Sequence, residues 1–230
     1  MTDLAPARQL SKPGFGREAL KRTLDVALAS MLIAASSPVL LLLWCLVRCT
    51  SPGPAFFRQE RVGRHLKPFT MLKLRSMYVD NDDQMHRAYV TGMLSADEAA
   101  DGPADVETTA PNGMLFKLVA DPRITPFGRW LRKTSLDELP QLINVVRGDM
   151  SLVGPRPMLP WEAELLTETY RPRFAVRPGL TGLWQVSGRS RLTMRTALEL
   201  DVEYVQRRST ALDLMILART VPALFRGGAS

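Results

Sequence analysis

One long apolar run near the N-terminus constrains this chain more than any other feature. Residues Leu24–Val47 read LDVALASMLIAASSPVLLLLWCLV, and Asp25 is the only charged residue among these 24. As a helix the run would be about 36 Å long, enough to cross a bilayer core of about 30 Å. No convincing small-residue cleavage site follows it, so we do not expect a removable signal peptide. The chain is therefore expected to hold a membrane-embedded helix.

Two properties of this run argue against a plain crossing of the membrane. Ser36-Ser37-Pro38 interrupts its middle, and a proline inside a helix removes a hydrogen bond and kinks the chain. Both flanks are basic, so the positive-inside rule gives neither flank a reason to leave the cytoplasm. A re-entrant hairpin, which enters and leaves by the same face, satisfies both facts. A kinked span stays open as the alternative, because proline alone does not force a reversal. The basic flanking residues are Arg17, Lys21, Arg22, Arg48, Arg58, Arg61 and Arg64.

Charge and composition narrow the choice of partners. Lys plus Arg is 30 against 23 for Asp plus Glu, which suits an anionic partner such as a nucleic acid, an anionic membrane or a phosphorylated substrate. Aromatic residues are only 7% and no motif interleaves them with a basic patch, so we expect no nucleic-acid binding. Cys45 and Cys49 lie four residues apart and form no disulfide framework. With two histidines elsewhere we expect no soft-metal site, which leaves a hard cation such as Mg²⁺.

The pattern along the chain predicts an α+β fold that is mostly helical. Residues 1–16 are polar and contain prolines and glycines, which indicates a mobile tail before the membrane helix at 17–50. Ala55–Arg61 and Lys67–Ser76 are expected to form two strands of a hairpin joined through Gly63. Residues 80–112 form an acidic insertion, which we expect to include an exposed loop, and a short strand is expected at 114–119.

Helical periodicity begins at Pro126. Apolar residues from Trp130 to Val146 recur at the spacing of one or two amphipathic helices, with basic residues on or beside the apolar face. Such helices can lie flat on anionic lipid, although an ordinary core-facing helix is the commoner alternative. Further helices are expected at 162–170, 196–207 and 212–225, the last interrupted by Pro222, with a turn at 177–182.

Two adjacent acids, Asp137 and Glu138, lie in the motif TSLDELPQL, and GDMSLVGPRP follows closely. Neighbouring carboxylates disfavour each other's ionised form. They are useful when one attacks a phosphorus atom and the other holds a metal. The plainer explanation is that both acids favour the positive end of a helix.

The motifs in their order resemble one family, the monotopic phosphoglycosyl transferases, which are bacterial sugar transferases that start exopolysaccharide, capsule and O-antigen assembly. The resemblance covers residues 21–229. It implies a small membrane-associated globule that sits on an N-terminal re-entrant membrane helix hairpin and on interfacial amphipathic helices. The family lies at the bacterial inner membrane, so 51–230 would be a cytoplasmic catalytic domain. The matching motifs are KRTLDVALA, GPAFFRQERVG, LKLRSM, DPRITPFGRWLRKTSLDELPQL, GDMSLVGPRP, RPGLTGLWQVSGRS, LDVEYV and LDLMIL.

The resemblance also implies a reaction and a set of roles. A sugar-1-phosphate, which we expect to be glucose or galactose phosphate, would pass from a UDP-sugar to polyprenyl (undecaprenyl) phosphate with release of UMP. Asp137 matches the family's nucleophile, which forms a covalent aspartyl intermediate, and Glu138 matches the acid that binds Mg²⁺. Arg156 matches a phosphate-binding arginine. Arg132 and Arg189 stand at motif arginines assigned to substrate, with surface or interfacial roles as their alternative.

Some expectations stay open at this point. Lys73 and Arg75 in LKLRSM are weaker candidates for the site. The insertion at 80–112 is absent from the smallest family members, so the sequence does not identify the sugar, and it neither requires nor excludes a homodimer. The alternative to an enzyme is a non-catalytic, basic membrane-surface scaffold of a glycan assembly complex.

Overall fold

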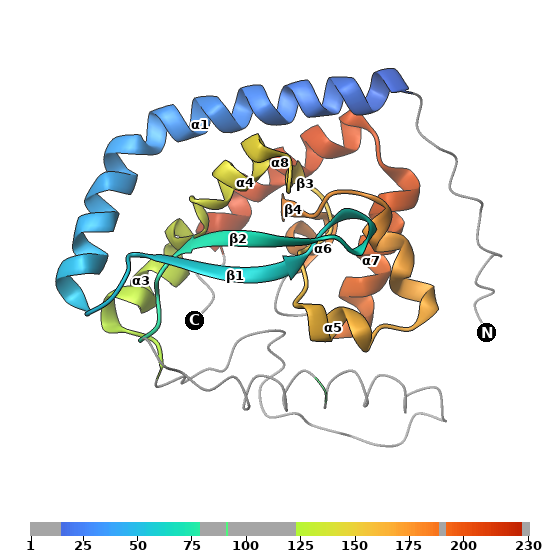
Figure 1. Cartoon of the computed structure of the whole chain (residues 1–230). Helices are drawn as coiled ribbons and strands as arrows, with labels where there is room; N and C mark the ends of the chain where they lie inside the picture. The colour runs from blue at the N-terminus through green and yellow to red at the C-terminus, as the bar shows by residue number, and fades with distance from the viewer. Residues whose placement is uncertain (1–14, 79–90, 92–122, 189–191, 227–230) are drawn as a thin grey trace.

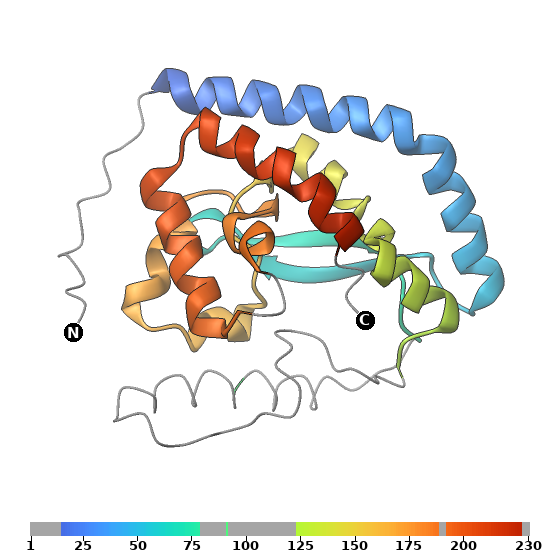
Figure 2. The same cartoon turned by 180° about the vertical axis from the view of Figure 1, so that it is seen from behind.

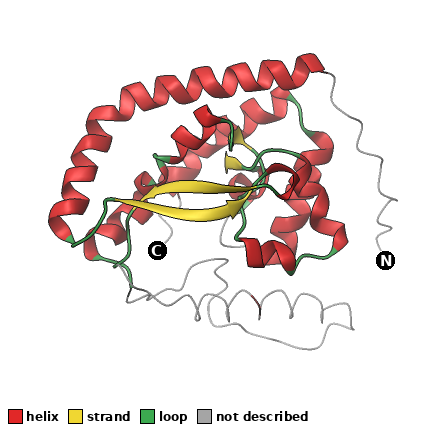
Figure 3. Cartoon of the chain, viewed as in Figure 1, coloured by secondary structure: helices red, strands yellow, loops and turns green. Residues whose placement is uncertain are grey.

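The computed structural model describes residues 15–78, 91, 123–188 and 192–226. The described part is mostly helical and contains two small sheets (Figure 1, Figure 3), which confirms the α+β class. Its helices are α1 (Phe15–Thr50), α3 (Pro126–Thr134), α4 (Gln141–Arg147), α5 (Pro160–Glu164), α6 (Leu183–Ser187), α7 (Met194–Arg207) and α8 (Thr210–Arg226). Three 3₁₀ turns are η1 (Arg64–Leu66), η2 (Leu136–Glu138) and η3 (Glu168–Ala175). The strands are β1 (Phe56–Val62), β2 (Pro68–Leu74), β3 (Ser151–Val153) and β4 (Gly179–Thr181).

Helix α1 is one bent helix rather than two helices joined by a loop. Pro38 lies inside it, and the helix changes direction along its length (Figure 1). Proline has no N–H to donate to the carbonyl four residues earlier, which is that of Ala34. The hydroxyl of Ser37 donates to this carbonyl instead, at 2.9 Å. The carbonyl of Ala34, which Pro38 cannot pair, is therefore satisfied at the bend. In an apolar setting an unsatisfied carbonyl would be costly.

The length and composition of α1 suffice for a membrane helix. Among the described residues it is the one helix long and apolar enough to cross a bilayer, and only 11% of its most apolar window is buried. Large side chains around the bend are exposed, including Met31, Leu41 and Leu42. The helix begins at Phe15, two residues inside the predicted tail, whose remainder lies outside the described residues.

Both halves of α1 pack on the same globule. Ala29, from the first half, is fully buried in a cluster with Val145 and Met150. Leu43 and Val47, from the second half, are buried in another cluster with Ala55, Leu74 and Leu131. The bent apolar helix thus lies along two sides of the globule, as the two opposite views show (Figure 1, Figure 2).

Polar contacts fix the first half of α1. Asp25, the one charge in the apolar run, is 6% exposed and accepts hydrogen bonds from the hydroxyl of Ser151 and from the N–H of Leu152. Lys21 donates to Asp213 at 2.8 Å and to the carbonyl of Val153 at 3.2 Å. The guanidinium of Arg22 donates to the carbonyls of Val145 and Val146 in the last turn of α4, at 2.6 and 2.7 Å. A cation there also complements the negative end of the helix.

The predicted hairpin is confirmed. β1 and β2 pair antiparallel, with Phe57 opposite Lys73 and Arg61 opposite Phe69, and the connection runs from Gly63 to Lys67 through η1. Directly opposed residues share a face of an antiparallel ribbon. Asn144 of α4, which is fully buried, closes the other edge of β2. Its amide accepts from the N–H of Leu72 at 3.0 Å and donates to the carbonyl of Thr70 at 2.7 Å.

The second sheet was not predicted. β3 and β4 pair in parallel, and β4 lies where the sequence predicted only a turn. Three residues are too few to show a period, so pattern alone gives no signal for such strands. The backbones of β4 and the segment after β3 meet closely, because a Cβ at Gly179 would lie 2.1 Å from the backbone nitrogen of Gly154.

The other expected elements are largely found. The helices predicted at 196–207 and 212–225 are α7 and α8, and Pro222 lies inside α8 without ending it. The helix predicted at 162–170 is replaced by the short α5 and the 3₁₀ turn η3. The acidic insertion at 80–112 and the strand at 114–119 lie outside the described residues apart from Thr91.

We predict that Asn144→Ala lowers the free energy of unfolding by about 3 kcal/mol, because it leaves two backbone groups of β2 without their partner in a buried place. Thermal unfolding in lipid nanodiscs, followed by intrinsic fluorescence, measures the change. Glu199→Gln, which disturbs only an exposed ion pair with Arg195 on α7, is the control and should leave the midpoint almost unchanged. Equal midpoints for the two variants would contradict the role given to Asn144.

Candidate active site

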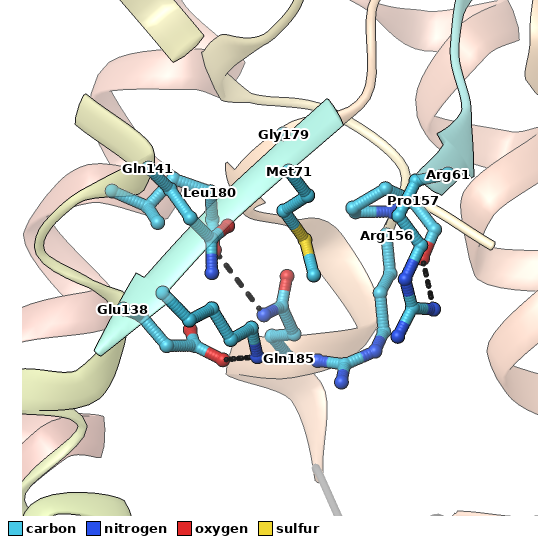
Figure 4. Close-up of a pocket in the computed structure, with 10 residues that line it drawn as sticks. Arg61, Met71, Glu138, Gln141, Arg156, Pro157, Gly179, Leu180 and Gln185 are labelled. Carbon is cyan, nitrogen blue, oxygen red and sulfur yellow. Dashed lines mark hydrogen bonds and ion pairs between the residues drawn. The ribbon is translucent and has the colours of Figure 1, made fainter. Parts of the chain in front are cut away.

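A pocket lies between the β1–β2 ribbon, η2, and the turn that follows β3. Figure 4 shows Glu138 on one side, Arg156 and Arg61 on the other, and Gln185 between them. Three cationic side chains and one carboxylate line it, so it suits an anionic ligand such as a diphosphate. The lining residues are Arg61, Met71, Lys73, Glu138, Gln141, Arg156, Pro157, Gly179, Leu180 and Gln185.

The acid pair is held by a short, capped segment. Helix α3 begins at the N-cap Thr125, whose hydroxyl accepts from the N–H of Gly128 at 2.9 Å, and Pro126 occupies its first turn. The helix ends at Ser135, which adopts a left-handed conformation with φ of 57°. This turn directs the chain into η2, which carries Asp137 and Glu138 between α3 and α4. Both acids therefore precede α4 rather than starting it, because Pro140 is the residue before its first turn.

The two neighbouring acids have different surroundings. Glu138 lines the pocket, and its Oε1 accepts from the ammonium of Lys73 at 2.9 Å. Asp137 is only 5% exposed and is not among the residues that line the pocket. Leu136, next to it, packs against the cluster that holds the second half of α1. The acid pair thus lies between the pocket and a cluster that includes Leu43 and Val47 of the apolar helix α1.

Arg156 reaches the pocket from the turn Gly154–Pro157. The structure brings Arg156 and Glu138, two of the predicted site residues, to the same cavity. Arg61 lies beside this turn, donates to the carbonyl of Pro157 at 3.2 Å and is 3.8 Å from a carboxylate oxygen of Glu162. The sequence marked Arg61 only as a flank of the membrane run. The register of the hairpin was the missed signal, since it places Arg61 on the same face as Lys73.

Two glutamines were also missed. Gln141, at the start of α4, is 3% exposed and lines the pocket. Gln185, in α6, donates through Nε2 to the carbonyl of Leu180 at 3.4 Å. Its Oε1 is buried and has no hydrogen-bond partner among the described residues, so it is an unsatisfied acceptor in the wall of the pocket. An uncharged residue in a helix gives no sequence signal for such a role.

Of the other predicted candidates that the structure describes, Arg132 and Arg75 do not line the pocket. Arg132 is half-buried in the last turn of α3 and does not line the pocket. Arg189 lies outside the described residues. Arg75 is 6% exposed and donates to the backbone carbonyl and the hydroxyl of Ser51, so it ties β2 to the end of α1. Of the two weaker candidates, only Lys73 lines the pocket.

The acidic side chains at the pocket bear on whether the site can hold a metal ion. No group of three or more His, Cys, Asp or Glu side chains within the described ranges could hold a metal ion by itself. Mg²⁺ in phosphoryl-transfer sites usually takes one or two carboxylates and completes its shell with phosphate oxygens and water. Glu138, which lines the pocket, fits such a site as its protein carboxylate. The Lys73 ammonium lies 2.9 Å from Oε1 of Glu138 and supplies a positive charge there.

A buried ion pair lies behind the Arg156 turn. Arg173 of η3 and Asp201 of α7 are each about 3% exposed at their side chains, and their Nη2 and Oδ2 atoms are 2.6 Å apart. Burial raises the pKa of Asp201 from 3.8 to about 6, while Arg173 opposes this shift. Because the folded-state pKa is the higher one, this carboxyl stabilises the fold most below pH 4, and that contribution is lost as the pH rises through about 6.

Comparisons with known proteins identify the family of the chain. The family model of the bacterial sugar transferases matches residues 16–227. The chain is 40% identical over 207 residues to the undecaprenyl-phosphate galactose phosphotransferase of Salmonella typhimurium, a match that covers 90% of this chain and 40% of that protein. It is 42% identical over 237 residues to the UDP-glucose:undecaprenyl-phosphate glucose-1-phosphate transferase of Caulobacter vibrioides, covering 96% and 78%.

A third relative has a more similar length. The exopolysaccharide production protein ExoY of Sinorhizobium fredii is 40% identical over 204 residues, covering 89% of this chain and 84% of that protein. The match to the family model spans nearly the whole chain, including α1, the acid pair and the Arg156 turn. The chain belongs to the bacterial sugar transferase family.

Proposed function

We propose that this protein transfers a sugar-1-phosphate from a UDP-sugar to polyprenyl phosphate, with undecaprenyl phosphate as the lipid, and releases UMP. The observation that carries the proposal is the pocket in which Glu138, Lys73, Arg61 and Arg156 meet, in a protein that also exposes a long apolar helix. A cationic pocket suits the diphosphate of a water-soluble donor, and an exposed apolar helix suits a protein whose second substrate is a lipid phosphate. The relatives named as undecaprenyl-phosphate transferases support the same reaction. Its product would be the first lipid-linked sugar of an exopolysaccharide, capsule or O-antigen.

The proposed chemistry has two displacements. A carboxylate oxygen of Asp137 attacks the phosphorus that carries the sugar, and the bond from that phosphorus to the UMP oxygen breaks. A phosphate oxygen of the polyprenyl phosphate then attacks the same phosphorus, the bond to Asp137 breaks, and the carboxylate is restored. For the first step the Asp137 carboxylate has to turn from its enclosed position toward the pocket lined by Glu138.

The remaining side chains bind and orient the donor. Arg156 and Arg61 offer planar guanidinium groups, which match phosphate oxygens in pairs. Bound Mg²⁺ would supply charge neutralisation of the diphosphate, with Glu138 as its principal protein ligand. Lys73 would then be free to exchange its contact with Glu138 for one with a phosphate. The buried oxygen of Gln185 offers an acceptor for an N–H or O–H of the donor.

The membrane arrangement belongs to the same proposal. A straight span would carry the second half of α1 away from the side of the first, whereas here both halves pack on one globule. This supports a re-entrant helix, with the globule on the cytoplasmic face of the inner membrane. Helix α3 would contribute to the interface, since Trp130 is 46% exposed and stacks on Phe127 with a ring separation of 5.5 Å.

Cysteine labelling tests the re-entrant arrangement. Cys45 and Cys49 are free and exposed, so both would first be replaced by Ala, and single cysteines placed at Thr2 and Ser230. We predict that neither position reacts with an impermeant maleimide in intact cells and that both react once the membranes are opened. Reaction of Thr2→Cys from the periplasm would favour the kinked span. Pro38→Leu should promote such a span, because it restores a straight apolar helix.

The aspartyl intermediate has a direct test. Protein incubated with UDP-glucose or UDP-galactose and Mg²⁺, without lipid, should release UMP and gain a hexose phosphate on the peptide that contains Asp137. Asp137→Asn should lose both signals, because a neutral amide is a poor nucleophile. Mass spectrometry of the digested protein detects the adduct, and initial-rate kinetics measure the release of UMP. No adduct, together with rates that require both substrates at once, would indicate a single direct displacement. UMP release by none of a panel of UDP-sugars would favour the scaffold alternative.

The donor's sugar is proposed as glucose or galactose, and the same panel tests it. Turnover of UDP-N-acetylhexosamines alone would contradict this choice.

Arg156→Lys tests the phosphate contact. The change keeps the charge but loses the planar fork, so we predict a fall of at least about tenfold in kcat/KM for the donor. Glu138→Gln is the companion variant and should weaken the dependence of the rate on Mg²⁺ while the fold persists. Unchanged kinetics in Arg156→Lys would leave this residue a structural part of the turn only.

A further inference from the structure

The turn that presents Arg156 is fastened through its main chain. Pro155 and Pro157 have no N–H, so Gly154 and Arg156 carry the only backbone donors of the turn. Gly154 donates to the carbonyl of Thr181 at 2.9 Å, and the carbonyl of Pro155 accepts from the N–H of Gly179 at 2.8 Å. The Gly154 and Pro155 groups are thus satisfied by β4 and its edge, which leaves the peptide groups of Arg156 itself to be explained.

The buried ion pair holds the carbonyl of Arg156. Nη2 of Arg173 donates to the carbonyl of Arg156 at 2.8 Å and to Oδ2 of Asp201 at 2.6 Å. The backbone of Arg156 also favours the charged form of the Asp201 carboxyl and so lowers its pKa against the effect of burial. The carbonyl of Arg156 is therefore held by a buried side chain of η3, which is held in turn by Asp201 of α7.

This pair is poorly suited to a purely stabilising role. Two charges taken out of water recover their loss only when every donor and acceptor is satisfied. Nε and Nη1 of Arg173 and Oδ1 of Asp201 have no hydrogen-bond partner in the described part of the chain. An apolar pair of similar volume could fill this place at no loss of stability. The desolvation cost of this ion pair is explained if its charged atoms hold the backbone of Arg156 in place, because apolar side chains cannot hydrogen-bond to that backbone.

We infer that Arg173 and Asp201 are positioning residues for donor binding, which act by clamping the peptide of Arg156 so that its guanidinium is held over the pocket. The inference rests on the proposed function for the ligand, a diphosphate of a nucleotide sugar, and on the contacts above for the clamp. A side chain aimed in advance loses less freedom when it binds, so the clamp strengthens the phosphate contact without touching the ligand.

Amide hydrogen exchange tests the clamp without reference to activity. Between Val153 and Met158 only Gly154 and Arg156 have an exchangeable backbone N–H, so exchange resolved to these amides by electron-transfer fragmentation reports the two ends of the turn. We expect Asp201→Asn to speed exchange at Arg156 at least about tenfold, with a smaller change at Gly154. Glu203→Gln, which loses an exposed ion pair with Arg207 on the same helix, is the matched control and should change neither amide.

Kinetics then test the consequence for the donor. We expect Asp201→Asn and Arg173→Lys to raise the KM for the UDP-sugar at least about fivefold, with little change in the KM for polyprenyl phosphate. In an Arg156→Ala background Asp201→Asn should cost less than about twofold further, because its effect passes through Arg156. Arg173→Lys covers the case in which Asp201→Asn does not fold, since it keeps the charge and one contact to Asp201.

The outcomes separate the two claims. Unchanged exchange at Arg156 in a folded Asp201→Asn or Arg173→Lys protein overturns the clamp, whatever the protein's reaction. Faster exchange with unchanged donor KM, or losses that add fully in the Arg156→Ala background, overturns the role in donor binding. Absence of UMP release by the wild-type protein overturns the proposed function and with it the ligand named here, while the exchange result still decides the clamp.

Discussion

The architecture depends on the polar attachment of an apolar helix to a globule. Asp25 is the one charged residue within the apolar run. Its carboxylate accepts hydrogen bonds from the hydroxyl of Ser151 and from the N–H of Leu152. A buried carboxylate is tolerated only with such partners. These contacts, with those of Lys21 and Arg22, fix where α1 lies on α4 and β3. The position of the globule relative to the apolar helix follows from this attachment.

The pocket is assembled from segments far apart in the sequence. Lys73 comes from the hairpin, Glu138 from η2, and Arg156 from the turn after β3. Each is held by a different device: strand pairing, a left-handed Ser135 at the end of a capped helix, and a turn with two prolines. Strand pairing, the end of the capped helix and the two prolines are all internal to the chain, and they hold three cationic side chains around one pocket, an arrangement that favours electrostatic binding of an anion.

The sequence predicted the features that have a local signature. The hairpin has two alternating runs around a glycine, α3 has a threonine cap before a proline, and the acid pair lies in a long motif. It did not predict β3 and β4, whose three residues each are too short for a period. It missed Arg61, Gln141 and Gln185, because their place in the pocket depends on register and on helix packing, which are long-range properties. For Arg132 the opposite happened. Its place in a motif suggested a role in the site, but the residue lies in the last turn of α3 and does not line the pocket.

The contact between Leu136 and the cluster of Leu43 and Val47 has a mechanical consequence. Leu136, the residue next to Asp137, packs against the same cluster as the second half of α1, whose outer side is apolar and exposed. Close-packed side chains transmit strain, so this cluster couples a displacement of the second half of the helix to the backbone that carries the acid pair.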